Sequence, residues 1–297
     1  MLFKASEEKN EVINGKQICY VEIGQSASPV LILIVGLGMQ LVEWPVGFIQ
    51  ALSRKYRLVL LDNRDAGKSA RYGPVHEETA KNFDWHLSDI RGMEYDLFDM
   101  AVDIIDLADH LSIRKFSCIG FSMGGMIAQI VAAQHRERVE ALACLCSSGG
   151  TLPLGATKEA ESVMNETMHN ARHDIETYTY RLFKSSQYFL GNAPFDTKKL
   201  FIETQKLVER SYNPGGIFRQ AKAIYGTTDR QKLLEQIHVP TLILHGMEDT
   251  CIHHTHAENT KRLISLARLE LLPKHGHYLS DELGMRVLNW LAEVHSK

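Results

Sequence analysis

The sequence lacks the features that would mark a membrane-spanning, secreted or nucleic-acid-binding protein. No apolar run approaches the length that crosses a bilayer, and the charge-rich residues 1–9 include no apolar core of a signal peptide. Lys and Arg number 33 against 36 acidic residues, so the net charge of −3 gives no electrostatic reason to expect a nucleic acid or an anionic membrane as partner. We therefore expect a cytoplasmic protein that neither spans a membrane nor binds nucleic acid.

Cysteine is also scarce, and its pattern argues against a disulfide framework. The five cysteines, Cys19, Cys118, Cys144, Cys146 and Cys251, are odd in number, and four of them lie on apolar, strand-like runs. This distribution favours reduced, buried thiols. Cys144 and Cys146 stand two residues apart on one face of such a run, which favours two core thiols over a redox pair.

Aliphatic runs that alternate with helix-like segments predict an α/β fold. With 297 residues, 44% of them hydrophobic, the chain is long enough for one large domain or for a domain with an insertion. Asn14-Gly15 between two short apolar segments predicts a hairpin that opens the sheet with an antiparallel edge. The other runs are unbroken, which predicts a mostly parallel central sheet with helices on both faces. They lie at 30–35, 57–62, 116–119, 139–146, 240–246 and 269–272.

Two stretches interrupt this alternation. Residues 66–92 carry many charges without clear periodicity, which predicts an excursion over the surface. Residues 151–234 contain no aliphatic strand run, and their helix-like segments carry many aromatic side chains. We interpret 151–234 as a helical cap that is inserted into a core domain made of 1–150 and 235–297.

The segment 116–131 has the pattern of a nucleophile elbow, a sharp turn between a strand and a helix that exposes a serine. Gly120-x-Ser122-x-Gly124 follows an apolar run and precedes a helix-like one, and the two glycines would let the flanking backbones pack closely. Ser122 would then stand at the positive end of the helix, where developing negative charge is favoured. We expect Ser122 to be a catalytic nucleophile rather than part of an ordinary structural turn.

A serine nucleophile needs a base that takes its proton and an acid that orients the base. In an open parallel sheet both should follow the carboxyl ends of strands, and elbow-type enzymes place them in the chain order serine, acid, histidine. Asp249 and His277 each follow a predicted strand, so we expect Asp249 to be the acid and His277 the base. Glu248 and His275 adjoin them and remain alternatives. His277 is preferred because Gly276 gives its loop an adaptable backbone.

An acyl-transfer site also needs two backbone N–H groups that point at the carbonyl oxygen, where negative charge develops. Met123, directly after the serine, would supply one of them. Leu37 would supply the other, because it follows the strand at 30–35 between two glycines that allow a close approach. Leu37 and Met123 are therefore the predicted oxyanion hole.

Three motifs imitate other kinds of site, and we interpret each as structural. Residues 36–41 lack the third glycine of a dinucleotide fingerprint, and 62–69 begins with aspartate where a phosphate loop needs its first glycine. The histidines of 253–256 have no further partner at metal-ligand spacing beyond Cys251. We expect neither a cofactor nor a metal.

Four motifs resemble the α/β-hydrolase family, and together they extend over nearly the whole chain. They are G-L-G-M-Q at 36–40, D-N-R-D-x-G-x-S at 62–69, D-L-x-D-M-A at 96–101 and G-x-S-M-G-G-M-I-A-Q at 120–129. Within the family they are similar to the capped serine esterase branch that includes aclacinomycin methylesterase-like proteins. The resemblance implies the same three catalytic residues. Val35 departs from it, since many relatives carry histidine there.

These patterns and the resemblance predict a cofactor-free serine hydrolase that cleaves a carboxylic ester of a small and largely apolar molecule through an acyl-enzyme intermediate. The aromatic side chains of the cap would either contact that substrate or form the cap's own core. The alternatives are a peptidase, a carbon–carbon hydrolase or a perhydrolase of the same fold, or a ligand-binding module without catalysis. The sequence is also compatible with a homodimer.

Overall fold

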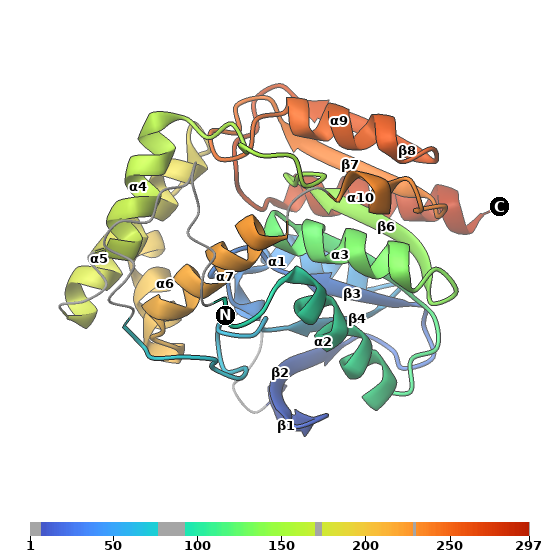
Figure 1. Cartoon of the computed structure of the whole chain (residues 1–297), viewed down its shortest axis with the longest axis horizontal. Coiled ribbons are helices and arrows are strands. Elements are labelled where there is room, and N and C mark those ends of the chain that lie inside the picture. The colour runs from blue at the N-terminus through green and yellow to red at the C-terminus, as the bar shows by residue number, and fades with distance from the viewer. Residues whose placement is uncertain (1–6, 77–92, 170–173, 228–229, 297) are drawn as a thin grey trace.

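A central sheet of eight strands organises the computed structural model, which describes residues 7–76, 93–169, 174–227 and 230–296 (Figure 1). The strands follow the order β1-β2-β4-β3-β5-β6-β7-β8 across the sheet. Their bounds are β1 Lys9–Ile13, β2 Lys16–Ile23, β3 Val30–Ile34, β4 Arg57–Leu61, β5 Phe116–Phe121, β6 Val139–Leu145, β7 Thr241–Gly246 and β8 Ala267–Leu272.

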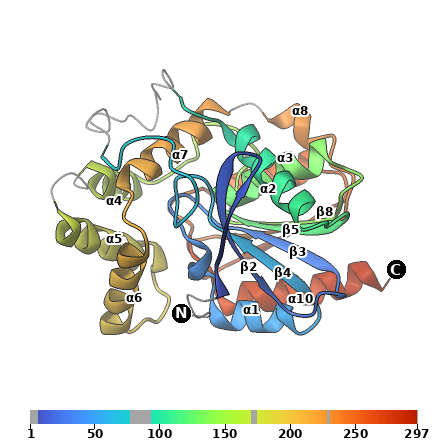
Figure 2. The ribbon, with the colours of Figure 1, turned by 90° about the horizontal axis from the view of Figure 1, so that it is seen from below.

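Helices cover both faces of this sheet. On one face α1 (Val46–Ser53) packs against α10 (Asp281–His295), and on the other lie α2 (Leu97–His110), α3 (Met123–Gln134) and α9 (Thr255–Leu263) (Figure 2). The predicted α/β architecture, a mostly parallel sheet between two layers of helices, is confirmed.

The antiparallel edge is confirmed as well. β1 and β2 form a hairpin whose two turn residues, Asn14 and Gly15, have φ angles of 48° and 77°. A two-residue turn requires such positive values, which asparagine and glycine tolerate best. β2 pairs antiparallel with β4, and every pairing from β4 to β8 is parallel.

β3 lies in the middle of the sheet and is buried on both faces. Ile32 and Ile34 pack into the layer of α2 and α3, whereas Leu31 and Leu33 pack into the layer of α1 and α10. None of these four side chains is exposed to solvent. Burial of each contributes roughly 2 kcal/mol, which is why this strand is apolar at every position rather than at alternate ones.

The strand order reverses between β3 and β5. From β3 the chain proceeds to β4 on one side, and it later returns to β5 on the opposite side of β3. Loops that follow β3 and β5 therefore diverge at the carboxyl edge of the sheet and leave a crevice, which is the usual place for a site in such a sheet.

Between β6 and β7 the described residues are helical. α4 (Lys158–His169), α5 (Ile175–Leu190) and α6 (Thr197–Arg210) pack in sequence to one side of the sheet, and α7 (Pro214–Gly226) contacts α4 (Figures 1 and 2). The short α8 (Gln231–Leu234) packs against α3 and α9. The division into a core domain and a cap of 151–234 stays a prediction.

Of the predicted surface excursion at 66–92, residues 77–92 lie outside the described residues. Residues 62–69, which precede them, form a turn around the Asp62 side chain. Its carboxylate accepts a hydrogen bond from the Lys68 backbone N–H at 2.9 Å and another from the Leu41 backbone N–H at 2.7 Å. The Ser69 hydroxyl donates to the Asp62 carbonyl at 2.6 Å. These contacts are those of a compact turn.

Two buried ion pairs join this turn to the helices between β6 and β7. Arg219 of α7 holds Asp65 with two hydrogen bonds of 2.7 and 2.8 Å, and neither side chain is exposed. Arg210, the last residue of α6, donates to Asp62 at 2.7 Å. Segments about 150 residues apart in sequence are thus held together, because a bidentate arginine–carboxylate contact fixes orientation as well as distance.

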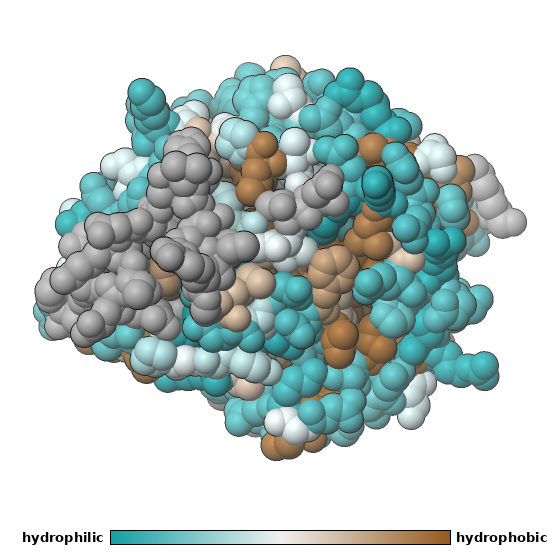
Figure 3. Space-filling model, in the orientation of Figure 1, coloured by the Kyte–Doolittle hydropathy of each residue, from teal (hydrophilic) through white to brown (hydrophobic). Residues whose placement is uncertain are grey.

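Most of the described surface in Figure 3 is hydrophilic, and apolar residues form smaller patches on that face. Within the described ranges, no helix combines the length and the apolar character that crossing a bilayer would demand.

We predict that Asp65→Asn lowers the free energy of unfolding by about 3 kcal/mol, because it removes the carboxylate charge that pairs with the buried Arg219 guanidinium. Asparagine is the conservative choice, since Asp65 has a φ of 64° that asparagine also tolerates. Urea unfolding measures the effect. Asp109→Asn is the control: its partner is Arg138, but its side chain is 60% exposed, so the loss should stay below about 1 kcal/mol. Equal losses in the two variants would contradict the prediction.

Candidate active site

The turn between β5 and α3 places Ser122 at the carboxyl edge of the sheet. Ser122 has φ 53° and ψ −120°, a strained conformation for a residue with a side chain, and α3 begins at the next residue. The flanking glycines are required by close packing. A Cβ atom at Gly120 would lie 2.2 Å from the Gly124 carbonyl oxygen, and one at Gly124 would lie 2.1 Å from the Ile34 carbonyl oxygen. The sequence pattern thus corresponds to a real elbow in the backbone.

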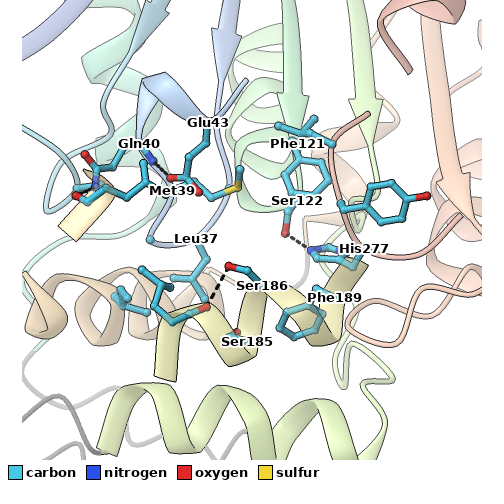
Figure 4. Close-up of a pocket in the computed structure, with 18 of the residues that line it drawn as sticks. Leu37, Met39, Gln40, Glu43, Phe121, Ser122, Ser185, Ser186, Phe189 and His277 are labelled. Carbon is cyan, nitrogen blue, oxygen red and sulfur yellow. Dashed lines mark hydrogen bonds between the residues drawn. The ribbon is translucent and has the colours of Figure 1, made fainter. Parts of the chain in front are cut away.

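The structure brings together the three residues that were predicted to form a triad. The Ser122 hydroxyl oxygen lies 3.0 Å from His277 Nε2, and His277 Nδ1 lies 2.7 Å from Asp249 Oδ2. Figure 4 shows the Ser122 and His277 side chains pointing toward each other. The three come from the ends of β5, β7 and β8, which are neighbours or near neighbours at one edge of the sheet.

Asp249 is held in place by its own loop. Its Oδ1 accepts hydrogen bonds from the backbone N–H groups of Cys251 and Ile252 at 2.9 and 2.8 Å. Burial alone would raise the pKa of Asp249, but the attraction of His277 and the hydrogen bonds from His245 and His277 outweigh it and keep this pKa well below its ordinary value. The carboxylate is therefore charged over the whole physiological range and can orient the imidazole.

The contact that lowers the pKa of Asp249 raises the pKa of His277. Burial alone would lower the pKa of His277, yet the Asp249 carboxylate raises it well above the ordinary value of a histidine. Aromatic rings enclose the imidazole on two sides: the centroids of Phe121 and Phe189 lie 5.1 and 6.0 Å from its own. A ring so enclosed keeps its orientation toward Ser122.

The two rival residues are not part of this arrangement. Glu248 is exposed and accepts a hydrogen bond from Asn192 at 3.3 Å. His275 is buried, stacks on Tyr278, and has its Nε2 3.1 Å from the Ser280 hydroxyl. Neither is hydrogen-bonded to Ser122 or to His277 within the described part of the chain.

The predicted oxyanion hole consists of the backbone N–H groups of Leu37 and Met123. Gly36 packs directly against the serine, since a Cβ atom there would lie 3.2 Å from Ser122 Cβ. Leu37, the next residue, lines the cavity in front of it. In the described residues the N–H groups of Leu37 and Met123 have no backbone or side-chain acceptor. They are therefore free to bind an oxyanion, and this role stays a prediction.

Sequence reasoning missed the residues that hold these groups in position. Gln220 of α7 accepts a hydrogen bond from Gly38 N–H at 2.7 Å and donates to the Arg64 carbonyl at 2.7 Å. Ser147 donates to the Ser122 carbonyl at 2.8 Å. His245 Nε2 lies 2.8 Å from the Ile252 carbonyl and 3.3 Å from Asp249. For His245 there was a signal, a polar residue that ends an aliphatic run; Gln220 is 182 residues from its partner and had none.

Ser122 and His277 open into a cavity of about 690 Å³ between the sheet and helices α4–α7. This volume suits a small organic molecule. The wall is mainly apolar, and its apolar members include Leu37, Met39, Val42, Phe121, Met126, Leu154, Met164, Leu182, Phe189, Leu200, Leu207, Ile217, Ile224 and Tyr225. Figure 4 shows Phe189, Ser185 and Ser186 of α5 on the side opposite the elbow.

The aromatic side chains of 151–234 divide between two places. Tyr178, Phe189 and Tyr225 line the cavity, whereas Phe183 and Phe201 meet edge to face, with ring centroids 5.2 Å apart, between α5 and α6. Some of these aromatic side chains thus pack among the helices and others line the cavity, where their contact with a substrate stays a prediction. Among the residues with described positions, no group of three histidine, cysteine or acidic side chains is arranged to hold a metal ion.

Comparison with known families gives a match that fits this geometry. The model of the alpha/beta hydrolase fold matches residues 29–282, which is most of the chain. The chain belongs to the alpha/beta hydrolase family. The matched range begins before β3 and ends in α10, so it includes the elbow, the Asp249 loop and the His277 loop.

Curated relatives of this alpha/beta hydrolase carry different names. It is 27% identical to the pimeloyl-(acyl-carrier protein) methyl ester esterase of Nitrosomonas europaea, over 84% of this chain and 88% of that protein. It is 25% identical to the 2-hydroxy-6-oxo-6-(2'-aminophenyl)hexa-2,4-dienoic acid hydrolase of Metapseudomonas resinovorans, over 90% and 83%. The dihydrolipoyllysine-residue acetyltransferase component of the acetoin cleaving system of Pseudomonas putida is 25% identical over 93% of this chain, which spans only 65% of that relative's length.

We predict that Gly124→Ala lowers the free energy of unfolding by at least about 3 kcal/mol, because the new methyl group would overlap the Ile34 carbonyl and neither backbone can move away. Thermal or urea unfolding measures the loss. Gly191→Ala is the control: nothing lies within 4 Å of its Cβ position, so it carries only the strain of a φ of 54°, about 1–2 kcal/mol. A loss at Gly124 no larger than at Gly191 would show that the elbow is less tightly packed than described.

Proposed function

We propose that this alpha/beta hydrolase is a serine esterase that cleaves a carboxylic ester of a small, largely apolar substrate. The observation that carries the proposal is the run of short contacts from Ser122 through His277 to Asp249 at the wall of a mainly apolar cavity. A relative of similar length whose name is that of a methyl ester esterase supports it.

In the proposed reaction the Ser122 hydroxyl oxygen attacks the ester carbonyl while His277 Nε2 takes its proton. Asp249 holds His277 in the tautomer with a proton on Nδ1 and stabilises the imidazolium that forms. The N–H groups of Leu37 and Met123 receive the negative charge on the former carbonyl oxygen. His277 then protonates the departing alkoxide, and a water molecule, deprotonated by His277, releases the acid from Ser122.

The proposal gives the cap of 151–234 two tasks. Its cavity-lining side chains exclude water and provide apolar contacts for the acyl or alcohol part. Phe189 of α5 covers the imidazole of His277, so the proton transfers would occur away from bulk solvent, where electrostatic contacts are stronger.

The same groups would also serve a hydrolase that attacks an amide or a carbon–carbon bond, since each reaction passes through an oxyanion next to a serine or a water. The relative named for a dienoic acid hydrolase keeps that candidate open. Turnover of p-nitrophenyl esters of graded acyl length, measured beside amino-acid arylamides and vinylogous 1,5-diketones, separates the three. Tight binding of a small molecule without any turnover would favour a binding module.

We predict that a fluorophosphonate probe labels the protein and that Ser122→Ala abolishes both labelling and ester hydrolysis, with a loss of about 10⁴-fold or more in kcat. Mass spectrometry of the labelled peptide checks the position. Ser148→Ala is the matched control, because Ser148 also lies 3.1 Å from a histidine, His256, but is fully buried away from the cavity wall. The fluorophosphonate probe should still label the Ser148→Ala variant. A folded protein that is never labelled would contradict the proposal.

We predict that kcat/KM for an ester decreases as the pH falls, and that the midpoint of this acid limb lies above pH 6.5. His277 must be unprotonated to act as a base, and Asp249 raises the pKa of His277, so protonation removes activity at a higher pH than for an unpaired histidine. Asp249→Asn should lower this limb while it also reduces the rate. A limb below pH 6 in the wild-type protein, or no shift in the variant, would show that the Asp249 charge does not act on the base.

A further inference from the structure

Glu43 places a carboxylate in the wall of the cavity. It ends a 3₁₀ turn, Leu41–Glu43, that directly follows residues 36–40, the loop next to Ser122. Its Oε2 accepts a hydrogen bond from the Gln40 backbone N–H at 2.6 Å. No described residue donates to Oε1, and the residue is half-buried and lines the cavity. Figure 4 shows Glu43 on the same side of the cavity as Ser122, opposite Ser185 and Ser186.

The cations of this region, Arg210 and Lys68, form ion pairs with carboxylates other than Glu43. Arg210 donates to Asp62 at 2.7 Å and to Glu8 at 3.0 Å, and Lys68 donates to Glu8 at 2.7 Å. This group therefore contains three carboxylates, those of Glu8, Asp62 and Glu43, but only two cations. Glu43 is the member that has no ion pair within the described residues.

The rest of the cavity wall does not offset this negative balance. Among the described residues, the carboxylates and lysines that line it, apart from Glu43, are Asp65, Glu161, Glu203, Asp281, Lys199 and Lys206; His277 also lines it and is paired with Asp249. Asp65 is paired with Arg219, and Glu203 faces Lys199 at 4.0 Å. With Glu161 left aside, the described wall then has the acidic groups of Glu43 and Asp281 and the basic group of Lys206. A cavity with this charge and mainly apolar walls attracts cations and repels anions.

The environment of Glu43 reflects the missing partner. Burial and, to a smaller extent, the charge of Asp62 raise the pKa of Glu43 to about 7, although the hydrogen bond from Gln40 and the charge of Arg210 act in the opposite direction. Tyr178 lines the same cavity and has its own pKa raised, first by burial and then by the charge of Glu43. A positive group bound at Oε1 would restore the favoured ionised state.

We propose that Glu43 binds a positively charged nitrogen group on the substrate, so that the cavity selects cationic esters over neutral esters of the same shape. The inference rests on the proposed esterase function for its kinetic consequence, but the binding of the cation does not require turnover. Glu43 would act as a specificity-determining residue: it contacts a part of the substrate that is remote from the scissile bond and leaves the chemistry to Ser122 and His277.

A structural role for Glu43 is separable from this one. Its contact with Gln40 N–H is half of a capping box, and glutamine serves there as well as glutamate does. Glu43→Gln therefore keeps the hydrogen bond and the shape of the turn while it removes the charge. Glu140→Gln is the matched control, because it removes the same charge from an exposed position at the start of β6, at the edge of the sheet opposite the elbow.

The test uses pairs of p-nitrophenyl esters of graded acyl length that end either in a trimethylammonium group or in a tert-butyl group. The two members of a pair have the same shape and differ only in charge. At the best chain length we expect the wild-type protein to favour the cationic member by about tenfold or more in kcat/KM, as a charge-assisted contact in a sheltered cavity provides. Glu43→Gln should reduce the preference to about one, and Glu140→Gln should leave it unchanged.

The same compounds, titrated calorimetrically into Ser122→Ala with and without Glu43→Gln, report binding without cleavage. Glu43→Gln should weaken only the cationic member, by about tenfold. An unchanged ratio in Glu43→Gln, a wild-type preference for the neutral member, or an equal loss for both members in a variant that melts like the wild type would each overturn the inference. Binding that depends on Glu43 in a protein that cleaves no ester would instead retain the cation site and reject the esterase.

Discussion

The close contact of three backbones, those of β3, β5 and the start of α3, is the constraint on which the rest of the site depends. Glycines at positions 120 and 124 are the only residues that fit between them, since any Cβ atom would overlap a carbonyl oxygen. This contact forces Ser122 into its strained conformation and directs its hydroxyl away from the sheet toward His277. The strain costs on the order of 1–3 kcal/mol, and the large buried core on both faces of the sheet supports it.

Charge organises the site in two layers. In the inner layer Asp249 and His277 stabilise each other's ionised forms, and their contact holds the imidazole beside Ser122. In the outer layer the pairs of Asp62 with Arg210 and of Asp65 with Arg219 attach α6 and α7 to the turn after β4. Buried ion pairs add little net stability because desolvation offsets their attraction. Their effect here is geometric: they determine which helices face the cavity and where.

Much of this could be predicted from the sequence because it is encoded locally. Unbroken aliphatic runs indicate strands buried on both faces, Asn14-Gly15 indicates a hairpin, and the glycines around Ser122 indicate the turn; the structure confirms these elements. Asp249 and His277 were found because strand ends in a parallel sheet converge. Gln220 could not be predicted, because its role depends on how α7 packs on a loop that is distant in sequence. The proposed role of Glu43 depends on which charges remain without an ion pair, and residue spacing in the sequence does not reveal this.

The hydrogen bond between Gln220 and Gly38 restricts the movement of α7 and therefore bears on how a substrate could enter the cavity. Gln220 and Arg219 attach α7 both to the loop beside Ser122 and to the turn after β4, so an outward movement of α7 would break these hydrogen bonds. α6 is anchored at its last residue in the same way. If the protein is the proposed esterase, its substrate would reach Ser122 past α4 and α5, where Phe189 lines the cavity with its ring centroid 6.0 Å from that of His277.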